Sequence, residues 1–352
     1  MAFLDVTDLE ITYTVGGGGL KAVDGVSFQL EEGQSLGVVG ESGCGKTTIA
    51  KGMMQLLPKN GRISAGSIRL KDRELVGLSK DAVRRVRLKE IAMISQSAMN
   101  ALNPVYTIGD QLIEGILTHT NFSKKEAYER AVQVFSLVGL EEKRLRSYPH
   151  QMSGGMKQRA VIAMALSLKP ALIIADEPTT ALDVVVQDRI LQRILKIQKE
   201  INSSMIFITH DISVVGEICD SIMVMYGGKV LEHSSTEQFF HTPFHPYSLG
   251  LQNAFPSITE MTEQLISIPG SPPNLIDPPQ GCRFRDRCPF AQPICAKEAP
   301  ELREVAPGHR VACHFTEKVD EFRVLAKKNE TWESVRNRLI QELHERGGQL
   351  HV

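Results

Sequence analysis

The sequence predicts an α/β fold, in which helices pack against a mostly parallel sheet. Two observations support this prediction. Strand-like and helix-like segments alternate in the middle of the chain, with apolar strands expected at 171–175, 205–209 and 221–226 and a helix at 184–199. A glycine-rich loop at 40–47 also stands between a short apolar strand and a helix. Alternation of this kind is typical of a sheet whose strands are connected by helices.

The first part of the chain predicts mainly strands. Candidate strands occupy 3–14, 23–34, 35–39, 63–70 and 91–95. Four consecutive glycines at 16–19 place a turn between the first two strands. The glycine-rich loop then leads into a helix expected at 47–57, which Pro58 ends.

Helices dominate the segment from about 106 to 168. Ser123 and Glu126 have the spacing of a capping box at the start of one helix. Apolar residues then recur at helical spacing as far as Gly139, which suits the C-terminal end of that helix. We therefore expect a helical insert in the middle of the sheet.

The composition changes after about residue 242. Most of the 17 prolines lie beyond this point, and proline at this density opposes long helices and strand ladders. Four of the six cysteines crowd into the same region, at Cys282, Cys288, Cys295 and Cys313. We expect a separate, loop-rich appendage here, followed by a polar helical pattern at 317–345.

Bulk composition excludes several classes of protein. A content of 42% hydrophobic and 23% charged residues is ordinary for a folded soluble chain. The 40 Lys and Arg against 41 Asp and Glu give a net charge of −1, which does not suggest a nucleic-acid-binding protein. Lys169 and Pro170 interrupt the longest apolar segment, so a membrane span of roughly 18 apolar residues is not expected. No secretory signal is visible either, so we expect a cytosolic protein whose membrane role comes through a partner.

The loop at 40–47 matches the pattern GxxxxGK[ST] in full. Its members are Gly40, Glu41, Ser42, Gly43, Cys44, Gly45, Lys46 and Thr47. The glycines let the backbone wrap around a β-phosphate and present N–H donors. We expect Lys46 to bridge the β- and γ-phosphates of a nucleoside triphosphate and the Thr47 hydroxyl to bind Mg²⁺. Thr48 completes the expected phosphate-binding set, and Cys44 is expected to be inert.

Polar side chains follow three of the expected strands. Asp176 and Glu177 come directly after 171–175, Gln96 follows 91–95 and His210 follows 205–209. Parallel sheets place their ligand sites at the C-terminal ends of their strands, so we expect these residues to converge. Asp176 and Gln96 suit Mg²⁺, and His210 suits a hydrogen bond to a γ-phosphate. Glu177 is expected to orient and deprotonate the attacking water.

A second anion-binding feature is expected at Ser153, Gly154 and Gly155. These residues begin the string SGGMKQR at 153–159, at the start of an expected helix. The first N–H groups of a helix have no partner within the helix, and they suit an anion such as a γ-phosphate. The loop at 40–47 already cradles phosphate, so the string is not needed for that purpose.

Together these motifs resemble the ATP-binding cassette (ABC) family over roughly residues 3–240. The features follow the family's order, including the signature string and a D-loop at 181–183 that ends in Asp183. The resemblance implies ATP and Mg²⁺ as cofactors. It also implies a cassette at 1–241 with a mixed sheet, an antiparallel β subdomain and a helical subdomain at about 97–168. Tyr13 lies where the family places an aromatic ring on adenine, with a core tyrosine as the alternative.

The family resemblance gives the signature string a role. ABC cassettes dimerise head to tail, so Ser153, Gly154 and Gly155 are expected to act in trans on ATP held by the partner cassette. The region after about residue 242 indicates which group within the family the chain resembles. His245-Pro246-Tyr247, the segment 268–273 and the cysteines are similar to the extension of dipeptide and oligopeptide importer ATPases. This similarity implies an extension at 242–316 and a terminal helix and tail at 317–352.

The four clustered cysteines follow the spacing C-x₅-C-x₆-C-x₁₇-C. Four thiolates can hold a [4Fe–4S] cluster or Zn²⁺. Structural zinc sites favour a closer C-x₂₋₄-C spacing, so the pattern favours [4Fe–4S], with zinc, disulfides or free thiols as alternatives. Arg283, Arg285 and Arg287 flank the first two cysteines. Their charge would offset an anionic cluster or would form a solvated basic patch.

The expected function is that of the ATPase subunit of an importer for dipeptides or oligopeptides. The expected partners are a second, non-identical cassette, two transmembrane permease subunits and, indirectly, an extracytoplasmic solute-binding protein, with no nucleic acid. The chain would sit peripherally on the cytoplasmic face of the membrane. Its permease-docking surface would comprise 100–104 and the helical insert.

Other functions remain as alternatives. Importers of this group also carry nickel or oligosaccharides. A soluble cassette in DNA repair or translation is disfavoured, since the chain has no long coiled coil and only one cassette. An exporter would usually carry fused membrane helices. An iron–sulfur redox protein is disfavoured because the ATPase motifs occupy two thirds of the chain.

Overall fold

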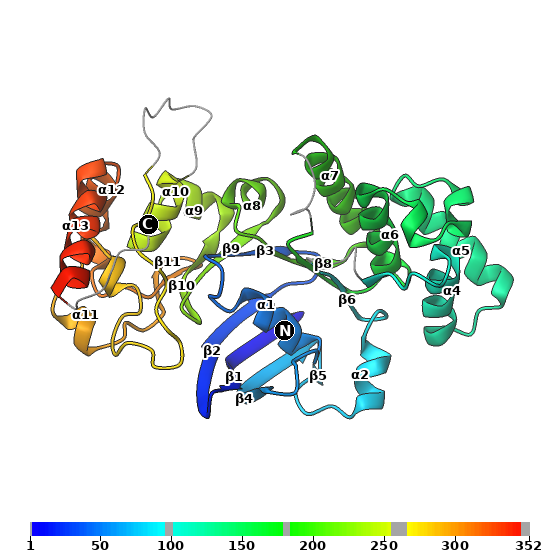
Figure 1. The fold of residues 1–352 in the computed structure, drawn as a ribbon, viewed down its shortest axis with the longest axis horizontal. Helices are drawn as coiled ribbons and strands as arrows, with labels where there is room; N and C mark the ends of the chain where they lie inside the picture. The colour runs from blue at the N-terminus through cyan, green and yellow to red at the C-terminus, as the bar shows by residue number, and fades with distance from the viewer. Residues whose placement is uncertain (1, 96–100, 179–183, 255–265, 346–352) are drawn as a thin grey trace.

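The computed structural model describes residues 2–95, 101–178, 184–254 and 266–345. Within these residues the strands form two sheets. The smaller sheet is antiparallel and contains, in spatial order, β2 (Gly18–Leu30), β1 (Leu4–Val15), β4 (Gly61–Leu70) and β5 (Arg73–Glu74). It lies against one face of the larger, mixed sheet (Figure 1). The expected α/β fold with a mixed sheet and an antiparallel sheet is confirmed.

The larger sheet is parallel at its centre and antiparallel at one edge. Its spatial order over the described residues is β11 (Arg303–Ala306), β12 (His309–Val311), β10 (Lys229–Ser235), β9 (Ser221–Tyr226), β3 (Ser35–Val39), β8 (Ser204–Ile208), β7 (Leu172–Asp176) and β6 (Ile91–Ile94). The strands from β9 to β6 run parallel. Because β11 and β12 extend the antiparallel edge, the C-terminal region continues the central sheet and is not the separate appendage that we expected.

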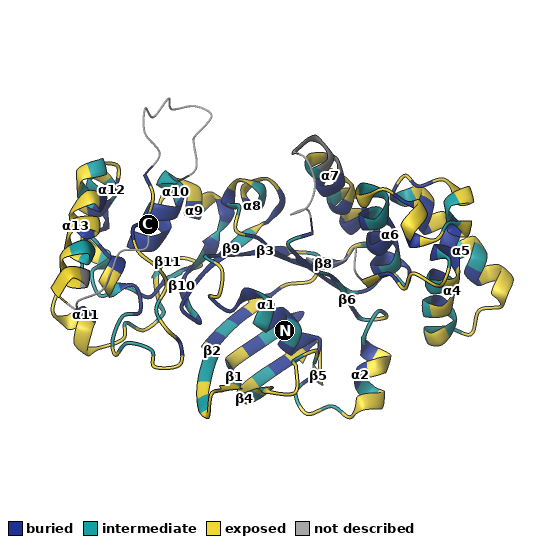
Figure 2. Cartoon of the chain, viewed as in Figure 1, coloured by how far each residue is buried: buried dark blue, intermediate teal, exposed yellow. Residues whose placement is uncertain are grey.

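Side chains of the central strands alternate between two hydrophobic cores. Leu172 and Ile174 pack toward the antiparallel sheet, whereas Ile173 and Ala175 pack on the opposite face. Burial on both faces explains the continuous apolar character of these strands, and Figure 2 shows the buried centre of the sheet.

Helices cover both faces of the mixed sheet (Figure 1). One face carries α1 (Lys46–Met53) together with the antiparallel sheet. The other face carries α7 (Val184–Ile201), α8 (Ile212–Ile218), α9 (Thr236–His241) and α10 (Pro246–Asn253). This arrangement places the start of α1 at the C-terminal end of β3.

The remaining helices lie at the two ends of the molecule and beside the small sheet (Figure 1). Beyond β6 are α4 (Ile108–His119), α5 (Lys124–Leu137) and α6 (Gly154–Leu166). At the other end are α11 (Ile294–Lys297), α12 (Val319–Ala326) and α13 (Asn329–Glu345), while α2 (Lys80–Val86) lies near β5. The capping box of Ser123 and Glu126 is confirmed at the start of α5. Among the helices that the structure describes, none combines the length and apolar character of a membrane span.

Several expected boundaries were wrong. The second strand, expected at 23–34, is β2 at Gly18–Leu30. The helix expected to reach residue 57 ends at Met53, because Gln55 takes a φ of 49° that a helix cannot accommodate. The glycine run is also not wholly a turn. Gly16 and Gly17 form a two-residue turn with φ of 54° and 83°, whereas the next two glycines already pair with β1. Positive φ at both turn positions is the geometry of a tight hairpin.

Candidate nucleotide-binding site

The glycine-rich loop leaves the end of β3 and enters α1 in a conformation that requires glycine. Gly40, Gly43 and Gly45 have φ values of 145°, 82° and 107°, which other residues rarely adopt. A Cβ atom on Gly40 would lie 2.1 Å from the carbonyl oxygen of Met225, and one on Gly45 would lie 2.4 Å from that of Ala22. The loop therefore packs directly against the backbone of β9 and β2.

The side chain of Lys46 crosses this loop. Its Nζ donates hydrogen bonds to the carbonyl oxygens of Gly40 at 2.6 Å and Glu41 at 3.0 Å. Lys46 is only 6% exposed, and a buried ammonium group needs such acceptors. A phosphate oxygen would be a stronger, charged acceptor, so this position of Lys46 fits the predicted contact with a phosphate.

Thr47 and Asp176 are brought together, as expected for two ligands of one cation. The Thr47 hydroxyl donates to Oδ1 of Asp176 at 3.0 Å. Burial raises the pKa of the Asp176 carboxyl more than this hydrogen bond lowers it, and the charge of Glu177 adds to the rise. A divalent cation at this position would favour the ionised carboxylate. The chemistry of this oxygen pair fits Mg²⁺.

Glu177 and His210 also lie together, at the ends of β7 and β8. Oε1 of Glu177 is 3.2 Å from Nδ1 of His210. The backbone of Glu177 has a φ of 47° and its N–H donates to the carbonyl of Ile208 at 2.9 Å. Strained backbone of this kind is common at functional sites. The side chain of His210 is 64% exposed, so the pair borders solvent, where water and nucleotide have access.

Tyr13 lies beside the same loop. Its hydroxyl is 3.5 Å from Oγ1 of Thr48 on α1, and its half-buried ring covers Gly61 of β4. Both the core role and the adenine-stacking role are consistent with this position. The expected site residues Gln96 and Asp183 lie outside the described residues, as does Asn100 of the expected docking segment.

Ser153 is the N-cap of α6, and its hydroxyl accepts a hydrogen bond from the N–H of Met156 at 3.4 Å. Ser153 and Gly154 are exposed. In the described part of the chain, no hydrogen bond joins residues 153–155 to the loop at 40–47. The start of α6 therefore presents its N–H groups to the surface of the cassette. A hydrogen bond from the Gln158 amide to the carbonyl of Pro178 links α6 to the segment just after Glu177.

The four clustered cysteines line one small cavity of about 20 Å³. Burial raises the pKa of Cys282 to about 11 and that of Cys313 to about 12, which favours neutral thiols. All six cysteines are unpaired, so the disulfide alternative was wrong for this structure. Over the described ranges, no three His, Cys, Asp or Glu side chains are arranged as a metal-binding group. The [4Fe–4S] cluster therefore stays a prediction.

Two of the three arginines beside these cysteines do not have the expected role, whereas Arg285 lines the cysteine cavity. Arg283 and Arg287 are 6% and 4% exposed, so they are not a solvated patch. Arg283 pairs with Asp24 on β2, and Nη1 of Arg287 is 2.7 Å from Oε2 of Glu41. Their charges are directed at cassette carboxylates, not at the cysteine cavity.

Sequence reasoning also missed one residue near the loop. The Tyr247 hydroxyl accepts a hydrogen bond from the backbone N–H of Glu41 at 3.0 Å. In the sequence, the tripeptide at 245–247 indicates only a similarity to the importer ATPases. Its histidine, which caps α10, and its proline, at the first position of that helix, are recognisable local signals. The long-range contact of its tyrosine has no such signal.

Comparisons with known proteins agree with this geometry. Residues 23–180 match the ABC transporter family, and residues 231–295 match the family described as oligopeptide/dipeptide transporter, C-terminal region. The oligopeptide transport ATP-binding protein OppD of Escherichia coli (strain K12) is 46% identical over 314 residues, which cover 89% of this chain and 93% of OppD. The dipeptide transport ATP-binding protein DppD of Bacillus subtilis (strain 168) is 43% identical over 326 residues, which cover 92% and 97%.

A solved structure shares the cassette. It is the dimeric structure of a post-hydrolysis state of the ATP-binding cassette MJ0796 bound to ADP and Pi, with a TM-score of 0.60 and 27% identity over 66% of this chain and 98% of that chain. The matched family, the relatives and the site geometry agree. The chain therefore belongs to the ABC transporter family of ATPases, in its group of oligopeptide and dipeptide transport ATP-binding proteins.

Proposed function

We propose that this chain is the ATP-hydrolysing subunit of an importer for oligopeptides or dipeptides. The transport proteins named above support the substrate class. One observation carries the ATPase role: the phosphate loop, the Thr47–Asp176 contact and the Glu177–His210 contact all lie at the C-terminal ends of the parallel strands. Parallel sheets bind their ligands at this edge.

The chain's own residues divide the work of hydrolysis. Lys46 and the loop N–H groups bind the phosphates, while Tyr13 stacks on adenine. Thr47, Asp176 and Gln96 hold Mg²⁺, which neutralises phosphate charge when it is bound. Glu177 takes a proton from the attacking water, and His210 contacts the γ-phosphate. The 3.2 Å contact between Glu177 and His210 supports their joint action.

The site requires a second cassette in this proposal. Ser153, Gly154 and Gly155 close over ATP held by the partner, and Asp183 of the D-loop lies at that interface. The exposure of Ser153 and Gly154 at the start of α6 and the dimeric state of MJ0796 support this arrangement. The partner is a non-identical cassette, and both cassettes dock on two permease subunits at the cytoplasmic face of the membrane. A solute-binding protein delivers the peptide from the other side.

Reconstitution tests the transport function. The chain, its partner cassette, both permeases and the binding protein are incorporated into proteoliposomes with MgATP inside. We expect uptake of labelled dipeptides or oligopeptides, with stimulated ATP hydrolysis that the Lys46→Ala variant abolishes. Uptake of nickel or an oligosaccharide in place of peptides would contradict the substrate class. Hydrolysis with no transport of any solute would contradict the importer role.

We also propose that Cys282, Cys288, Cys295 and Cys313 bind a [4Fe–4S] cluster. Four cysteine sulfurs line one cavity, two of them from buried and two from half-buried residues, and such a donor set suits iron or zinc. Such a group would supply a structural cross-link, and no step of hydrolysis depends on it. Iron and sulfide are measured after anaerobic purification of the wild type, Cys288→Ser and the control Cys219→Ala. We expect four irons per chain in the wild type and in Cys219→Ala, and their loss in Cys288→Ser. A colourless protein with stoichiometric zinc would refute the cluster.

A further inference from the structure

Glu41, the second residue of the phosphate loop, is held by two residues of the C-terminal region. Its backbone N–H donates to the Tyr247 hydroxyl at 3.0 Å, and its Oε2 accepts from Nη1 of Arg287 at 2.7 Å. Its carbonyl oxygen accepts from Nζ of Lys46 at 3.0 Å. One loop residue therefore connects the C-terminal region to the lysine that contacts phosphate.

Arg287 is itself fixed by several other contacts. Its Nε donates to the carbonyl of Pro269 at 2.8 Å and its Nη2 to that of Ile268 at 3.2 Å. The guanidinium also lies over the ring of Tyr226, 5.6 Å from the centroid. Because these contacts set its position independently of the loop, Arg287 orients Glu41 and does not merely follow it.

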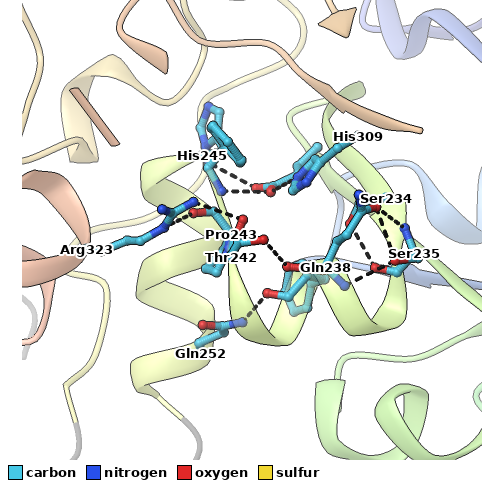
Figure 3. Close-up of polar contacts among 12 residues, drawn as sticks. Ser234, Ser235, Gln238, Thr242, Pro243, His245, Gln252, His309 and Arg323 are labelled. Atoms are coloured by element: carbon cyan, nitrogen blue, oxygen red, sulfur yellow. Dashed lines mark hydrogen bonds and ion pairs between the residues drawn. The ribbon is translucent and has the colours of Figure 1, made fainter. Parts of the chain in front are cut away.

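Tyr247 is equally well fixed. Its ring packs against Tyr226 and Phe284, with centroid distances of 4.9 Å and 5.1 Å. The first turn of its helix, α10, is capped by His245, whose Nδ1 accepts from the N–H of Tyr247 at 3.0 Å. The N–H of His245 in turn donates to the buried carboxylate of Glu232 at 2.8 Å. Figure 3 shows His245 close to His309, which contacts the same carboxylate.

The charge of Glu41 makes its pairing important for an anionic ligand. A carboxylate in the phosphate loop repels polyphosphate, and partly buried charges are poorly screened by salt. The side chain of Arg287 in the pair is only 5% exposed, against 27% for Glu41. Arg287 therefore offsets the negative charge of the loop while it holds the loop in place.

We propose that Arg287 and Tyr247 are positioning residues for ATP: they hold Glu41, set the shape and charge of the phosphate loop, and so make ATP affinity depend on the C-terminal region. This inference rests on the proposed role of residues 40–48 as the ATP site. Arg287 precedes Cys288 directly in the chain. The cysteine-bearing segment thus positions Arg287. We call Arg287 and Tyr247 together the clamp on Glu41.

The test compares Arg287→Met and Tyr247→Phe with the wild type, in the full chain and in the assembled transporter. Arg287→Met is expected to raise both the Kd for MgATP and the KM of hydrolysis about tenfold, since it removes a hydrogen bond between charged groups. Tyr247→Phe is expected to raise them about threefold, the effect of one neutral hydrogen bond. The kcat is expected to stay within about twofold, because neither side chain contacts the reacting atoms.

Arg285→Met is the matched control. Among the described residues, the hydrogen bonds of Arg285 stay within its own segment, to Asp286 and to the carbonyls of Gln280 and Ala296. Its Kd is expected to match the wild type. In the double variant Glu41→Gln/Arg287→Met, removal of the unpaired charge is expected to restore most of the lost affinity. Wild-type affinity in a folded Arg287→Met protein, or losses that simply add in the double variant, would overturn the proposal.

Two variants keep the outcome clear. If Arg287→Met does not fold, Tyr247→Phe, which keeps the buried ring, decides alone, and an unchanged Kd overturns the inference. Lys46→Ala separates an error in the roles of Arg287 and Tyr247 from an error in the proposed ATP site. If it abolishes MgATP binding while both clamp variants bind normally, only the clamp is wrong. If it leaves binding intact, the proposed ATP site is wrong as well.

Discussion

The Thr47 hydroxyl donates a hydrogen bond to Oδ1 of Asp176 at 3.0 Å, which joins the first turn of α1 to the last residue of β7. The two residues are 129 positions apart in the sequence. The predicted oxygen ligands of one cation thus already lie together, and the buried carboxylate has a raised pKa. We expect this buried carboxylate to contribute more to the binding of a cation than to the stability of the fold.

Asp176→Asn separates these two roles. The amide oxygen can still accept from Thr47 and the buried charge is gone, so the Tm of the nucleotide-free protein should be unchanged or higher. A raised pKa in the folded state means that the ionised form costs stability above that pKa, which the variant relieves. Hydrolysis should fall by about 100-fold or more, since the metal site is worth several kcal/mol.

Thermal shift measurements check this prediction. ATP with Mg²⁺ should raise the Tm of the wild type, and this Mg²⁺-dependent increase should disappear in Asp176→Asn. A variant that keeps the full Mg²⁺-dependent shift would exclude Asp176 as part of the metal site.

Glu177→Gln should bind ATP yet barely hydrolyse it. The amide keeps the size of the side chain, but it cannot accept a proton from water, and loss of a general base costs about 10²- to 10⁴-fold in rate. Steady-state hydrolysis and the Kd for MgATP are measured in the assembled transporter. Glu217→Gln, on the exposed surface of α8, is the control and should retain the wild-type rate. Near-normal hydrolysis by Glu177→Gln would contradict the role of Glu177 as general base.

Ser153→Arg should block closure of the partner's site without affecting the chain's own phosphate loop. The bulky cation covers the exposed start of α6, where the partner's nucleotide is expected. Hydrolysis by the assembled transporter should therefore fall at least about tenfold, the effect expected for loss of one transition-state contact. The Kd of the isolated chain for MgATP should not change.

The control for this variant is Ser334→Arg, the same substitution at an exposed position of α13, outside the expected permease-docking surface. It should hydrolyse ATP at the wild-type rate. If Ser153→Arg weakens MgATP binding by the isolated chain, the signature residues act in cis and the head-to-tail arrangement is wrong.

Local patterns account for the convergence of residues that the sequence predicted. The phosphate loop, Asp176, Glu177 and His210 each adjoin a short apolar strand, and parallel strands bring their C-terminal ends to one edge. The same strand motif that identifies each residue therefore also locates it at this edge of the sheet. The end of α1 was missed because a single left-handed residue, Gln55, leaves no clear pattern.

The long-range contacts of the C-terminal region could not be predicted. Glu41 and Arg287 are 246 positions apart, and an arginine beside cysteines is equally compatible with a cluster, with solvent or with a distant carboxylate. The two edge strands, β11 and β12, have only four and three residues. Such short segments cannot display a hydrophobic alternation, so the proline content dominated the prediction of a separate appendage.

The buried pair of Glu232 and His309 gives a stability prediction for this region. Oε1 of Glu232 lies 2.7 Å from Nε2 of His309, and its carboxylate also accepts from the N–H groups of Phe244 and His245 at 2.8 Å each. Glu232→Ala leaves these groups buried without an acceptor, so the free energy of unfolding should fall by about 3–5 kcal/mol. Urea denaturation measures it, with the exposed loop variant Glu301→Ala expected within about 0.5 kcal/mol of wild type. Because α10 carries Tyr247, folded Glu232→Ala should also bind MgATP more weakly than the wild type. Equal stability of Glu232→Ala and Glu301→Ala would show that this buried network does not hold α10 in place.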